Sequence, residues 1–330
     1  MANEEQDALF TRREWLQAGA VLGAAYDVVI IGGGPAGLSA ALALGRARKR
    51  VLLCDSGPRR NAAAVHLHNF VTRDGVTPDE FRRLAREQLS QYPSVVVQDV
   101  LVGGVTGAKD AFHVAAGADT VDARRVLLCT GVIDEMLPLD GFRELWGHAV
   151  VQCPHCHGWE SRDRPWGYLA RAEHASHLQL FAVQLRGWTN LVCVFTNGDF
   201  ELPAAAQSQL IAAGLRIETA RIGRLVAREH RLEAIELSDG TRVACELLFA
   251  HPPQHQVDVV RALGVALDSE GLVQVDPMSR QTSVPGVFAA GDLTTRMQAA
   301  IAAAASGMQA AAMINADLMM DPCGARGWSR

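Results

Sequence analysis

Short apolar runs alternate with longer helical segments along two stretches of the chain, the pattern of β-strand–helix–β-strand units. The apolar runs are typical of buried strands in a parallel sheet. They predict strands at 27–31, 51–54, 166–170 and 191–195, and helices at 35–45 and 175–186. We therefore predict an α/β fold with two Rossmann-like nucleotide-binding domains of the three-layer ββα type.

The segments around these units indicate that the second domain is inserted into the first. They predict helices at 78–90, 202–213 and 297–320, hairpins within 95–129, a meander at 225–249 and a strand at 287–290. Pro252-Pro253 marks a return crossover. The predicted parts are an N-terminal extension at 1–25, a first domain at 26–134 and 252–330, and an insert at 135–251.

A glycine-rich turn, Gly32-Gly33-Gly34-Pro35-Ala36-Gly37, follows the first predicted strand. In such a turn Gly32 permits the bend, Gly34 lets the backbone approach a pyrophosphate, and Gly37 lets helix and strand pack closely. The N-terminus of the helix presents free N–H groups and a positive dipole end to the phosphates. Asp55, at the end of the next strand, lies close to the spacing of a carboxylate that binds the adenosine ribose. The turn predicts a dinucleotide site without distinguishing nicotinamide from flavin.

A second cofactor signal is Gly291-Asp292, which closes a predicted strand ahead of the long C-terminal helix. An aspartate in this place suits the ribitol hydroxyls of a flavin, and a helix from Met297 directs its N-terminal amides at the ring. The alternative is that Asp292 is the N-cap of that helix. Together with the glycine turn, this pattern favours FAD over a nicotinamide-only enzyme.

Cys153-Pro154-His155-Cys156-His157 is the segment with the most distinctive chemistry. Two cysteines with two residues between them can close a small disulfide ring at a helix N-terminus, where the dipole favours the thiolate. A dithiol between two halves of a dinucleotide site indicates thiols that exchange electrons with a flavin. The same spacing is also typical of c-type haem attachment, and Cys/His clusters bind zinc. Four further cysteines lie in apolar runs and are expected to be small buried hydrophobic residues: Cys54, Cys129, Cys193 and Cys245.

The chain resembles the low-molecular-weight thioredoxin reductases and their relatives over about 26–318. The resemblance rests on four segments in the same order: Gly32 to Gly37, Thr130-Gly131, Cys153 to Glu160, and Thr282 to Asp292 with Gln298-Ala299 beyond. It implies an FAD domain interrupted by a smaller pyridine-nucleotide domain that carries the dithiol, and a homodimer. It implies cofactor contacts at Gly32, Gly34, Pro35, Ala36, Gly37, Asp55, Asn69, Thr130, Gly131, Gly291, Asp292, Gln298 and Ala299.

The resemblance also implies a role for each residue of the dithiol segment. Cys156 is expected to face the flavin, and Cys153 to exchange with the substrate. The reductases have an aspartate as acid/base after the second cysteine, whereas this chain has His157. A histidine titrates near neutral pH, so it can both take a thiol proton and return it. His66 and His68 fall where the family approaches the flavin ring, and an ordinary surface or core role is equally open for both.

The insert departs from the family where NADPH is bound. The aligned glycine segment reads Ala170-Arg171-Ala172-Glu173-His174-Ala175, with alanines at both close-approach positions. Glu173 adds a negative charge where a phosphate is expected. After the next strand, Thr196-Asn197-Gly198-Asp199 and Glu201 replace the arginines that hold the 2′-phosphate in the family. NADPH is therefore doubtful as a cofactor.

Without NADPH, electrons are expected to run from a substrate dithiol to the Cys153–Cys156 pair, to FAD and then to O2. The Cys-Pro-x-Cys-His-Gly-x-Glu form of the segment is closest in pattern to the dithiol oxidases that install disulfides in gliotoxin, holomycin and romidepsin. The alternative is an NADPH-dependent reductase of a thioredoxin-like protein. A third hypothesis is a flavin-bound redox sensor. The expected partner is a small-molecule dithiol or a thioredoxin-like protein.

Composition and the N-terminal residues bear on the class of partner and on localisation. The 330 residues are 49% hydrophobic and 20% charged, with a net charge of -5, which indicates neither a nucleic-acid nor a membrane partner. Arg12-Arg13 ahead of an apolar stretch resembles a twin-arginine export signal, but Glu4, Glu5 and Asp7 oppose a positive n-region. We expect a cytoplasmic protein, with export as the alternative.

Overall fold

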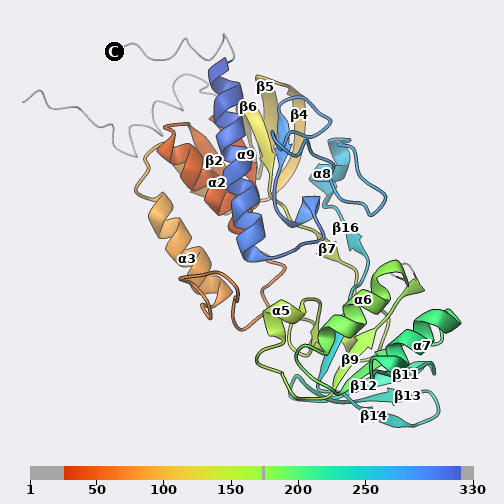
Figure 1. Cartoon of the computed structure of the whole chain (residues 1–330). Helices are drawn as coiled ribbons and strands as arrows, with labels where there is room; N and C mark the ends of the chain where they lie inside the picture. Colours follow the sequence, from red (N-terminus) through yellow and green to blue (C-terminus); the bar gives the residue numbers. More distant parts are fainter. Residues whose placement is uncertain (1–25, 173–174, 321–330) are drawn as a thin grey trace, which may run out of the picture. The chain divides into compact units, whose positions relative to one another are not determined.

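The computed structural model describes residues 26–172 and 175–320 (Figure 1). The described residues form two compact units: unit 1 comprises 26–60, 79–133 and 255–320, and unit 2 comprises 61–78, 134–172 and 175–254. Most of unit 2 is thus inserted between two parts of unit 1. The predicted extension at 1–25, with its twin-arginine segment, lies outside the described residues.

Unit 1 is built on one sheet with helices packed against it (Figure 1). Its elements are β1 (Tyr26–Ile31), α2 (Pro35–Arg46), β2 (Val51–Cys54), α3 (Pro78–Leu89), β3 (Val95–Gln98), β4 (Val102–Ala108), β5 (Ala111–Ala116), β6 (Asp119–Leu128), α8 (Asp258–Ala262), β17 (Val287–Ala289), the 3₁₀ turn η2 (Asp292–Thr294) and α9 (Ala300–Met320). The sheet has the order β3-β2-β1-β6-β5-β4, and β17 also pairs with β6. The pairings of β1 with β2 and β6, of β2 with β3 and of β17 with β6 are parallel, whereas β4 and β5 form an antiparallel extension.

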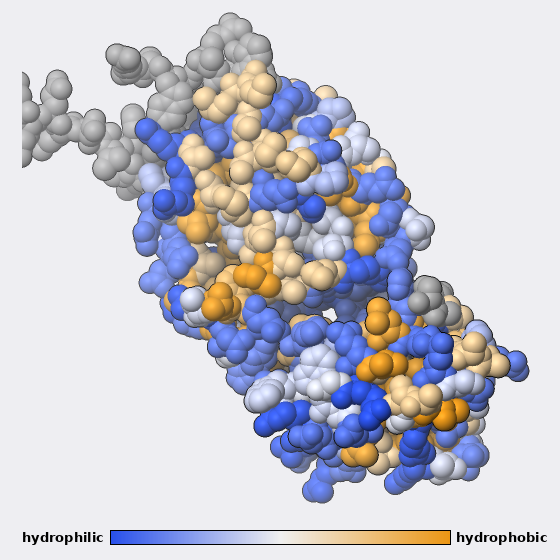
Figure 2. Space-filling model, in the orientation of Figure 1, coloured by the Kyte–Doolittle hydropathy of each residue, from blue (hydrophilic) through white to orange (hydrophobic). Residues whose placement is uncertain are grey.

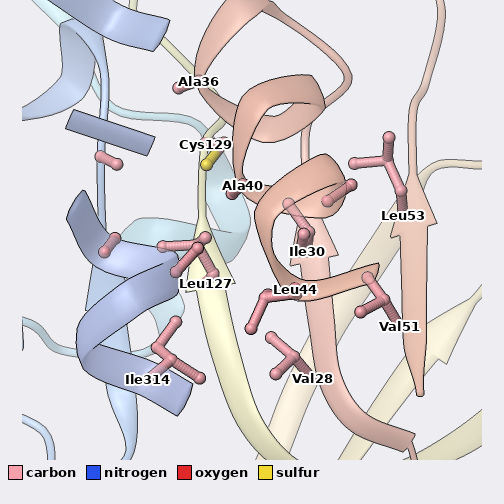
Figure 3. Packing of buried hydrophobic residues seen from close by; sticks show 14 of the residues in the cluster. Val28, Ile30, Ala36, Ala40, Leu44, Val51, Leu53, Leu127, Cys129 and Ile314 are labelled. Carbon is pink, nitrogen blue, oxygen red and sulfur yellow. The ribbon is translucent and has the colours of Figure 1, made fainter. Parts of the chain in front are cut away.

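The core of unit 1 brings α2 and α9 together over the parallel strands (Figure 3). Ala40 and Leu44 of α2 are fully buried, as is Ile314 of α9. Small residues allow the two helices to approach closely: a Cβ at Gly307 of α9 would overlap the carbonyl of Ala36 at the start of α2. This packing holds α9 against α2.

A buried ion pair also ties α9 to the sheet. Arg125 on β6 is fully buried, and its guanidinium contacts Asp317 near the end of α9 and Asp110 in the β4–β5 turn, the latter at 2.7 Å. Lys109 contacts the same Asp317 at 2.9 Å from a more exposed position. The single positive charge of Arg125 is thus paired with two carboxylates.

Unit 2 combines a parallel sheet with a small antiparallel one (Figure 1). Its elements, with the connecting strands β7 and β16, are β7 (Ile133–Asp134), α4 (Phe142–Leu145), β8 (Val150–Val151), α5 (Pro154–His157), β9 (Trp166–Leu169), α6 (Ala175–Leu185), β10 (Val192–Phe195), α7 (Ala204–Ala212), β11 (Arg216–Glu218), β12 (Ile222–Arg228), β13 (Arg231–Leu237), β14 (Arg242–Ala244), β15 (Leu247–Ala250) and β16 (Gln254–His255). The parallel sheet has the order β11-β10-β9-β15-β8, the antiparallel sheet has the order β12-β13-β14, and β7 pairs with β16.

The predicted α/β fold is confirmed, with three corrections. The predicted meander at 225–249 divides, because β15 leaves it and joins the parallel sheet beside β9. The C-terminal helix begins at Ala300 rather than Met297, since η2 and five non-helical residues precede it. Asp292 therefore begins η2 and is not the N-cap of α9.

The third correction concerns 61–78, which belong to unit 2 and not to the first domain. Ala63 packs so closely on Gly147 that a Cβ at Gly147 would lie 2.6 Å from it, and Asn69 bonds to the carbonyl of His155. These contacts join residues some eighty positions apart, so no local pattern indicates them.

Apolar side chains gather on the surface of unit 2 over α6 and α7 (Figure 2). Leu180 on α6 is 74% exposed and Ile211 on α7 is 57% exposed. Within the described part of the chain, no helix is both long and apolar enough to cross a membrane.

Candidate functional site

The glycine turn of unit 1 joins β1 to α2 and has the geometry that a pyrophosphate site requires. Gly32 has a φ of 112°, and a Cβ there would overlap the carbonyl oxygen of Cys129. A Cβ at Gly37 would overlap the carbonyl oxygen of Gly32. At Gly34, by contrast, nothing lies within 4 Å of an added Cβ, so the backbone borders open space. Gly32 and Gly37 therefore leave no room for a side chain, whereas the backbone at Gly34 is open to a ligand.

The N-terminus of α2 is suited to an anion. Pro35 is at its first helical position, and its N-cap, Gly34, supplies no side-chain cap. The first turn contains no acidic residue. The orphan amides and the positive dipole end are thus not neutralised by the helix itself.

Asp55 ends β2 as predicted, but it is already strongly hydrogen-bonded. It accepts from the backbone N–H of Gly57 at 3.0 Å, from Arg82 Nη2 at 2.6 Å and from Arg86 Nη2 at 3.2 Å. Burial alone would raise the pKa of Asp55, but the Gly57 bond and the two guanidinium groups outweigh it and the pKa lies below its ordinary value. A Cβ at Gly33 would overlap this carboxylate, so Asp55 lies directly beneath the glycine turn. The two arginines are site residues that sequence reasoning missed, since α3 shows only an ordinary charged face.

The C-terminal segment meets the glycine turn inside unit 1. Gly291 has a φ of 92°, and a Cβ there would lie 3.1 Å from the Cβ of Ala36. Its N–H donates to Ser306 Oγ at 2.9 Å. Asp292 accepts from Arg60 Nη1 at 3.2 Å, a partner that no sequence pattern indicated. Segments separated by some 250 residues are thus adjacent, as a shared cofactor site requires.

The remaining residues expected at the flavin lie around this junction. Thr130 and Gly131 follow β6, and a Cβ at Gly32 would lie 3.1 Å from Thr130 Cα. Gln298 and Ala299 lie between η2 and α9, where the Ala299 carbonyl accepts from the N–H of Ala303. The open approach at Gly34, the uncapped α2 and the adjacency of Gly291 to Ala36 fit a bound FAD. Its candidate ligands in unit 1 are Gly32, Gly34, Pro35, Ala36, Gly37, Asp55, Thr130, Gly131, Gly291, Asp292, Gln298 and Ala299.

The dithiol lies in unit 2, on the short helix α5. Cys153 and Cys156 form a disulfide with a Cα–Cα distance of 5.3 Å. The N–H of Cys156 donates to the carbonyl of Cys153 at 3.2 Å, and both residues are half-buried. Because α5 is a single turn, its dipole supports the thiolate less than a long helix would. The pair is closed, accessible and able to exchange with a thiol.

His157 ends α5 in a partly buried position. Burial lowers the pKa of its imidazole, against opposing effects of the Cys153 carbonyl and the Glu160 charge. In the tautomer with a proton on Nδ1, that nitrogen donates to the Cys153 carbonyl at 3.4 Å, which leaves Nε2 free as a base. His157 is thus set up to be neutral at neutral pH and to accept a proton.

Residues 67–76 approach the dithiol segment from elsewhere in unit 2. Asn69 Nδ2 donates to the His155 carbonyl at 2.7 Å. His68 Nε2 lies 3.6 Å from Glu160 Oε1, and its Nδ1 lies 3.4 Å from Asp74 Oδ2. Asn69 was expected at the flavin, and its contact with the dithiol segment is one that the sequence did not indicate.

The turn that follows β9 in unit 2 begins at Ala170. It occupies the same place in its sheet as the glycine turn of unit 1. Ala170 N–H donates to Phe195 O at the end of the neighbouring strand, as Gly32 N–H donates to Cys54 O. Ala170 is buried and, unlike Gly32, has no positive φ. Thr196 stands in the place of Asp55 and is fully buried. Glu173 and His174 lie outside the described residues.

The other described cysteines are buried, as predicted. Burial raises the pKa of Cys54 to about 11 and that of Cys193 to about 12, and it raises the pKa values of Cys129 and Cys245 further. Thiolates do not form readily at these sites, which leaves Cys153–Cys156 as the candidate redox pair among the described cysteines.

The structure therefore gathers the predicted residues into two groups. The expected FAD ligands lie in unit 1, with the exception of Asn69. Cys153, Cys156, His157 and Asn69 lie in unit 2.

Comparison with known proteins agrees with this arrangement. Residues 26–307 match the family described as Pyridine nucleotide-disulphide oxidoreductase. Thioredoxin reductase tcpT of Claviceps purpurea is 35% identical over 309 residues, which cover 89% of this chain and 95% of that protein. An oxidoreductase from Agrobacterium tumefaciens of known structure is 37% identical, with a TM-score of 0.83, over 90% of this chain and 99% of that one. The structure of HlmI is similar over 90% and 93% of the two chains, with 34% identity and a TM-score of 0.82.

The family match covers most of the chain, and the fold, the glycine turn and the paired cysteines all agree with it. Family membership implies FAD as the cofactor. The chain thus belongs to the pyridine nucleotide-disulphide oxidoreductases, as a thioredoxin-reductase-like, FAD-dependent thiol/disulfide oxidoreductase.

Proposed function

We propose that the protein oxidises a substrate dithiol to a disulfide through Cys153–Cys156 and FAD, with O2 as the terminal acceptor. The observation that carries this proposal is the difference between the two nucleotide turns. Gly32 combines a positive φ with open space nearby at Gly34, whereas Ala170 has neither the φ nor the missing side chain. Thr196, buried in the place of Asp55, offers no carboxylate to a ribose. Unit 2 retains the fold of a nucleotide domain without the turn that seats a pyrophosphate.

The thiol chemistry follows from the closed pair. A substrate thiolate attacks Cys153 Sγ, forms a mixed disulfide and releases the Cys156 thiolate. The second substrate thiol then attacks the substrate sulfur of the mixed disulfide, which yields the substrate disulfide and releases the Cys153 thiolate. His157 Nε2 takes a proton from a substrate thiol and passes it to a thiolate of the reduced Cys153–Cys156 pair. FAD, when bound, supplies the two-electron acceptor that recloses the pair and passes the electrons to O2.

An apolar surface on α6 supports a small apolar dithiol as the substrate. Gln184 of α6 reaches the ring of His155 between the two cysteines, with 3.1 Å between Gln184 Nε2 and His155 Nε2. Leu180 lies one turn earlier on the same face and is 74% exposed, and Val183 is 38% exposed. The surface of α6 next to His155 thus carries exposed apolar side chains that an apolar substrate could contact.

The direction of electron flow is tested with the FAD-loaded protein in the absence of oxygen. We expect excess NADPH to leave the flavin absorbance near 450 nm essentially unchanged, whereas a small dithiol should bleach it. Cys153→Ser is the matched control, since it removes the exchanging sulfur and should prevent bleaching by dithiols. Rapid bleaching of the wild type by NADPH would contradict the oxidase. Sustained O2 consumption with a dithiol separates an oxidase from a redox sensor.

The pH profile tests His157. Because burial lowers its pKa, His157 stays a neutral base below the ordinary histidine pKa of about 6.5, and flavin reduction should fall only at more acidic pH. In His157→Ala we expect the rate at about pH 7 to fall about 10²-fold, and to rise with pH as the substrate thiol ionises near about 8.5. His113→Ala, at an exposed histidine of unit 1, is the control and should keep the wild-type profile. An identical profile in His157→Ala would remove His157 from the mechanism.

One observation favours the alternative, an NADPH-dependent reductase. A Cβ at Gly198 would lie 3.0 Å from Arg221 Cγ, so the side chain of an arginine packs against the turn after β10. The family holds a 2′-phosphate with arginines in this region, and the tcpT relative is named a thioredoxin reductase. The NADPH experiment above decides between the two.

A further inference from the structure

The segment 67–76 is a hydrogen-bonded loop that places Asn69 beside His155, between the two cysteines. Leu67 N–H donates to Val76 O at 2.8 Å, and Gly75 N–H donates to Leu67 O at 2.9 Å, which closes the base of the loop. Asp74 Oδ1 accepts from the N–H of Asn69 at 2.7 Å. Asn69 has a φ of 62°, a left-handed conformation that asparagine tolerates better than most residues. These hydrogen bonds fix the backbone of Asn69 independently of the contact that its side chain makes.

The side chain of Asn69 bonds to a backbone group that α5 cannot satisfy. The helix ends after one turn, so its last carbonyls have no helical partner. Asn69 Nδ2 donates to the carbonyl of His155, between the two cysteines, at 2.7 Å. This hydrogen bond joins residues 67–76 directly to the backbone of the Cys153–Cys156 ring.

Other contacts hold His155 through its ring rather than through its carbonyl. The His155 ring lies edge-on to Trp188, with 5.2 Å between ring centroids, and lies 3.1 Å from the Gln184 amide. Trp188 also packs on Gly158, where a Cβ would lie 2.9 Å from the indole ring. With Trp188 and Gln184 holding the ring of His155, the Asn69 amide supplies the restraint on its carbonyl.

We infer that Asn69 is a positioning residue for the Cys153–Cys156 pair: its amide holds the backbone of α5 in the conformation in which the disulfide closes. Closing the pair removes two protons and two electrons from two thiols and forms one S–S bond. The ease of this step depends on the effective concentration of one sulfur at the other, which a restrained backbone raises. The inference deepens the proposed function, but it holds for either direction of electron flow.

The test is the equilibrium of the holoprotein with a glutathione redox buffer under anaerobic conditions. Glutathione disulfide takes up the two electrons and two protons and becomes two glutathione molecules. The closed fraction is measured by alkylation and mass spectrometry of the peptide that contains Cys153 and Cys156. For Asn69→Gly, which preserves the left-handed backbone, we expect the equilibrium constant for closure to fall about tenfold, which corresponds to a rise of about 30 mV in reduction potential. Asn69→Asp, which keeps the shape but lacks the amide donor, should shift it in the same direction.

Asn197→Gly is the matched control. Asn197 is also a left-handed asparagine of unit 2, with a φ of 56°, and its Oδ1 accepts from the N–H of Ile222 at 2.8 Å. This variant should lower stability without changing the equilibrium of the pair. An unchanged equilibrium in the folded Asn69 variants, or an equal shift in Asn197→Gly, would overturn the inference. If Asn69→Gly does not fold, Asn69→Asp decides the question.

The two proposals fail independently. If wild-type protein is bleached by NADPH, the oxidase is wrong, but the shift in closure equilibrium still tests Asn69. If dithiols bleach the wild type and Asn69 variants close their disulfide normally, the oxidase stands and the positioning role falls.

Discussion

Cys156→Ser should abolish flavin reduction by dithiols, with a loss of about 10³-fold or more, while FAD stays bound. A substrate thiolate can displace a leaving group from Cys153 only when Cys156 is bonded to it. The flavin can take up two electrons from the pair only when both thiols are present to close the disulfide. FAD should be retained because the residues that fit it lie in unit 1, whereas Cys156 lies in unit 2. Anaerobic stopped-flow absorbance measures the rate, and the flavin-to-protein ratio measures retention.

Mass spectrometry adds a second readout for this variant. Cys153 keeps its thiol in Cys156→Ser, so it should form a mixed disulfide with an activated, already oxidised substrate and hold it. Cys193→Ala is the control: Cys193 is buried and its pKa is raised to about 12, so its removal should leave the rate within about twofold. Loss of FAD from Cys156→Ser, or persistent bleaching by dithiols, would mean that the redox centre is elsewhere.

Arg125→Ala should destabilise unit 1 by about 3–5 kcal/mol, because it leaves two partly buried carboxylates without their buried cation. The guanidinium of Arg125 is fully buried, and it joins β6 to Asp110 and to Asp317 on α9. Burial raises the pKa of Asp317, but Lys109 and Arg125 outweigh it, and the pKa lies below its ordinary value. The stabilisation from Asp317 is therefore complete above its unfolded pKa of about 3.9 and is lost as pH falls through the lower folded pKa.

Chemical denaturation followed by circular dichroism measures the free energy of unfolding, and release of flavin fluorescence reports on unit 1 separately. Lys109→Ala removes a more exposed partner of the same Asp317 and should cost no more than about 1 kcal/mol. Equal effects of the two variants would show that the burial of Arg125 adds nothing to the pair.

Local patterns were sufficient for the elements and for the chemistry of the short motifs. The runs at 27–31 and 51–54 became β1 and β2, and Gly32 in the turn between β1 and α2 has a positive φ that glycine adopts easily. The Cys153–Cys156 pair closes as its spacing indicates. Strand periodicity, a positive φ and a two-residue gap between cysteines are properties of neighbouring residues. They can therefore be predicted from the sequence without knowledge of the fold.

The residue at which a helix begins was harder to predict from the sequence, and the reason is energetic. The alanine-rich segment favours helix throughout, yet α9 begins only at Ala300, because η2 and the contact of Gly291 with Ala36 direct the preceding backbone. Intrinsic propensities differ by fractions of a kcal/mol per residue, which packing readily overrides.

The sequence by itself determined the α/β fold class, most of the strands and helices, the glycine turn after β1 and the pairing of Cys153 with Cys156. The tertiary structure alone decided that 61–78 join unit 2, that Asn69 meets the carbonyl of His155, and that Arg60, Arg82 and Arg86 engage the cofactor-site carboxylates. These contacts join residues from 27 to 232 positions apart. A side-chain amide or guanidinium has the same identity wherever it points, and only the packing of the surrounding elements determines which partner lies within hydrogen-bonding distance.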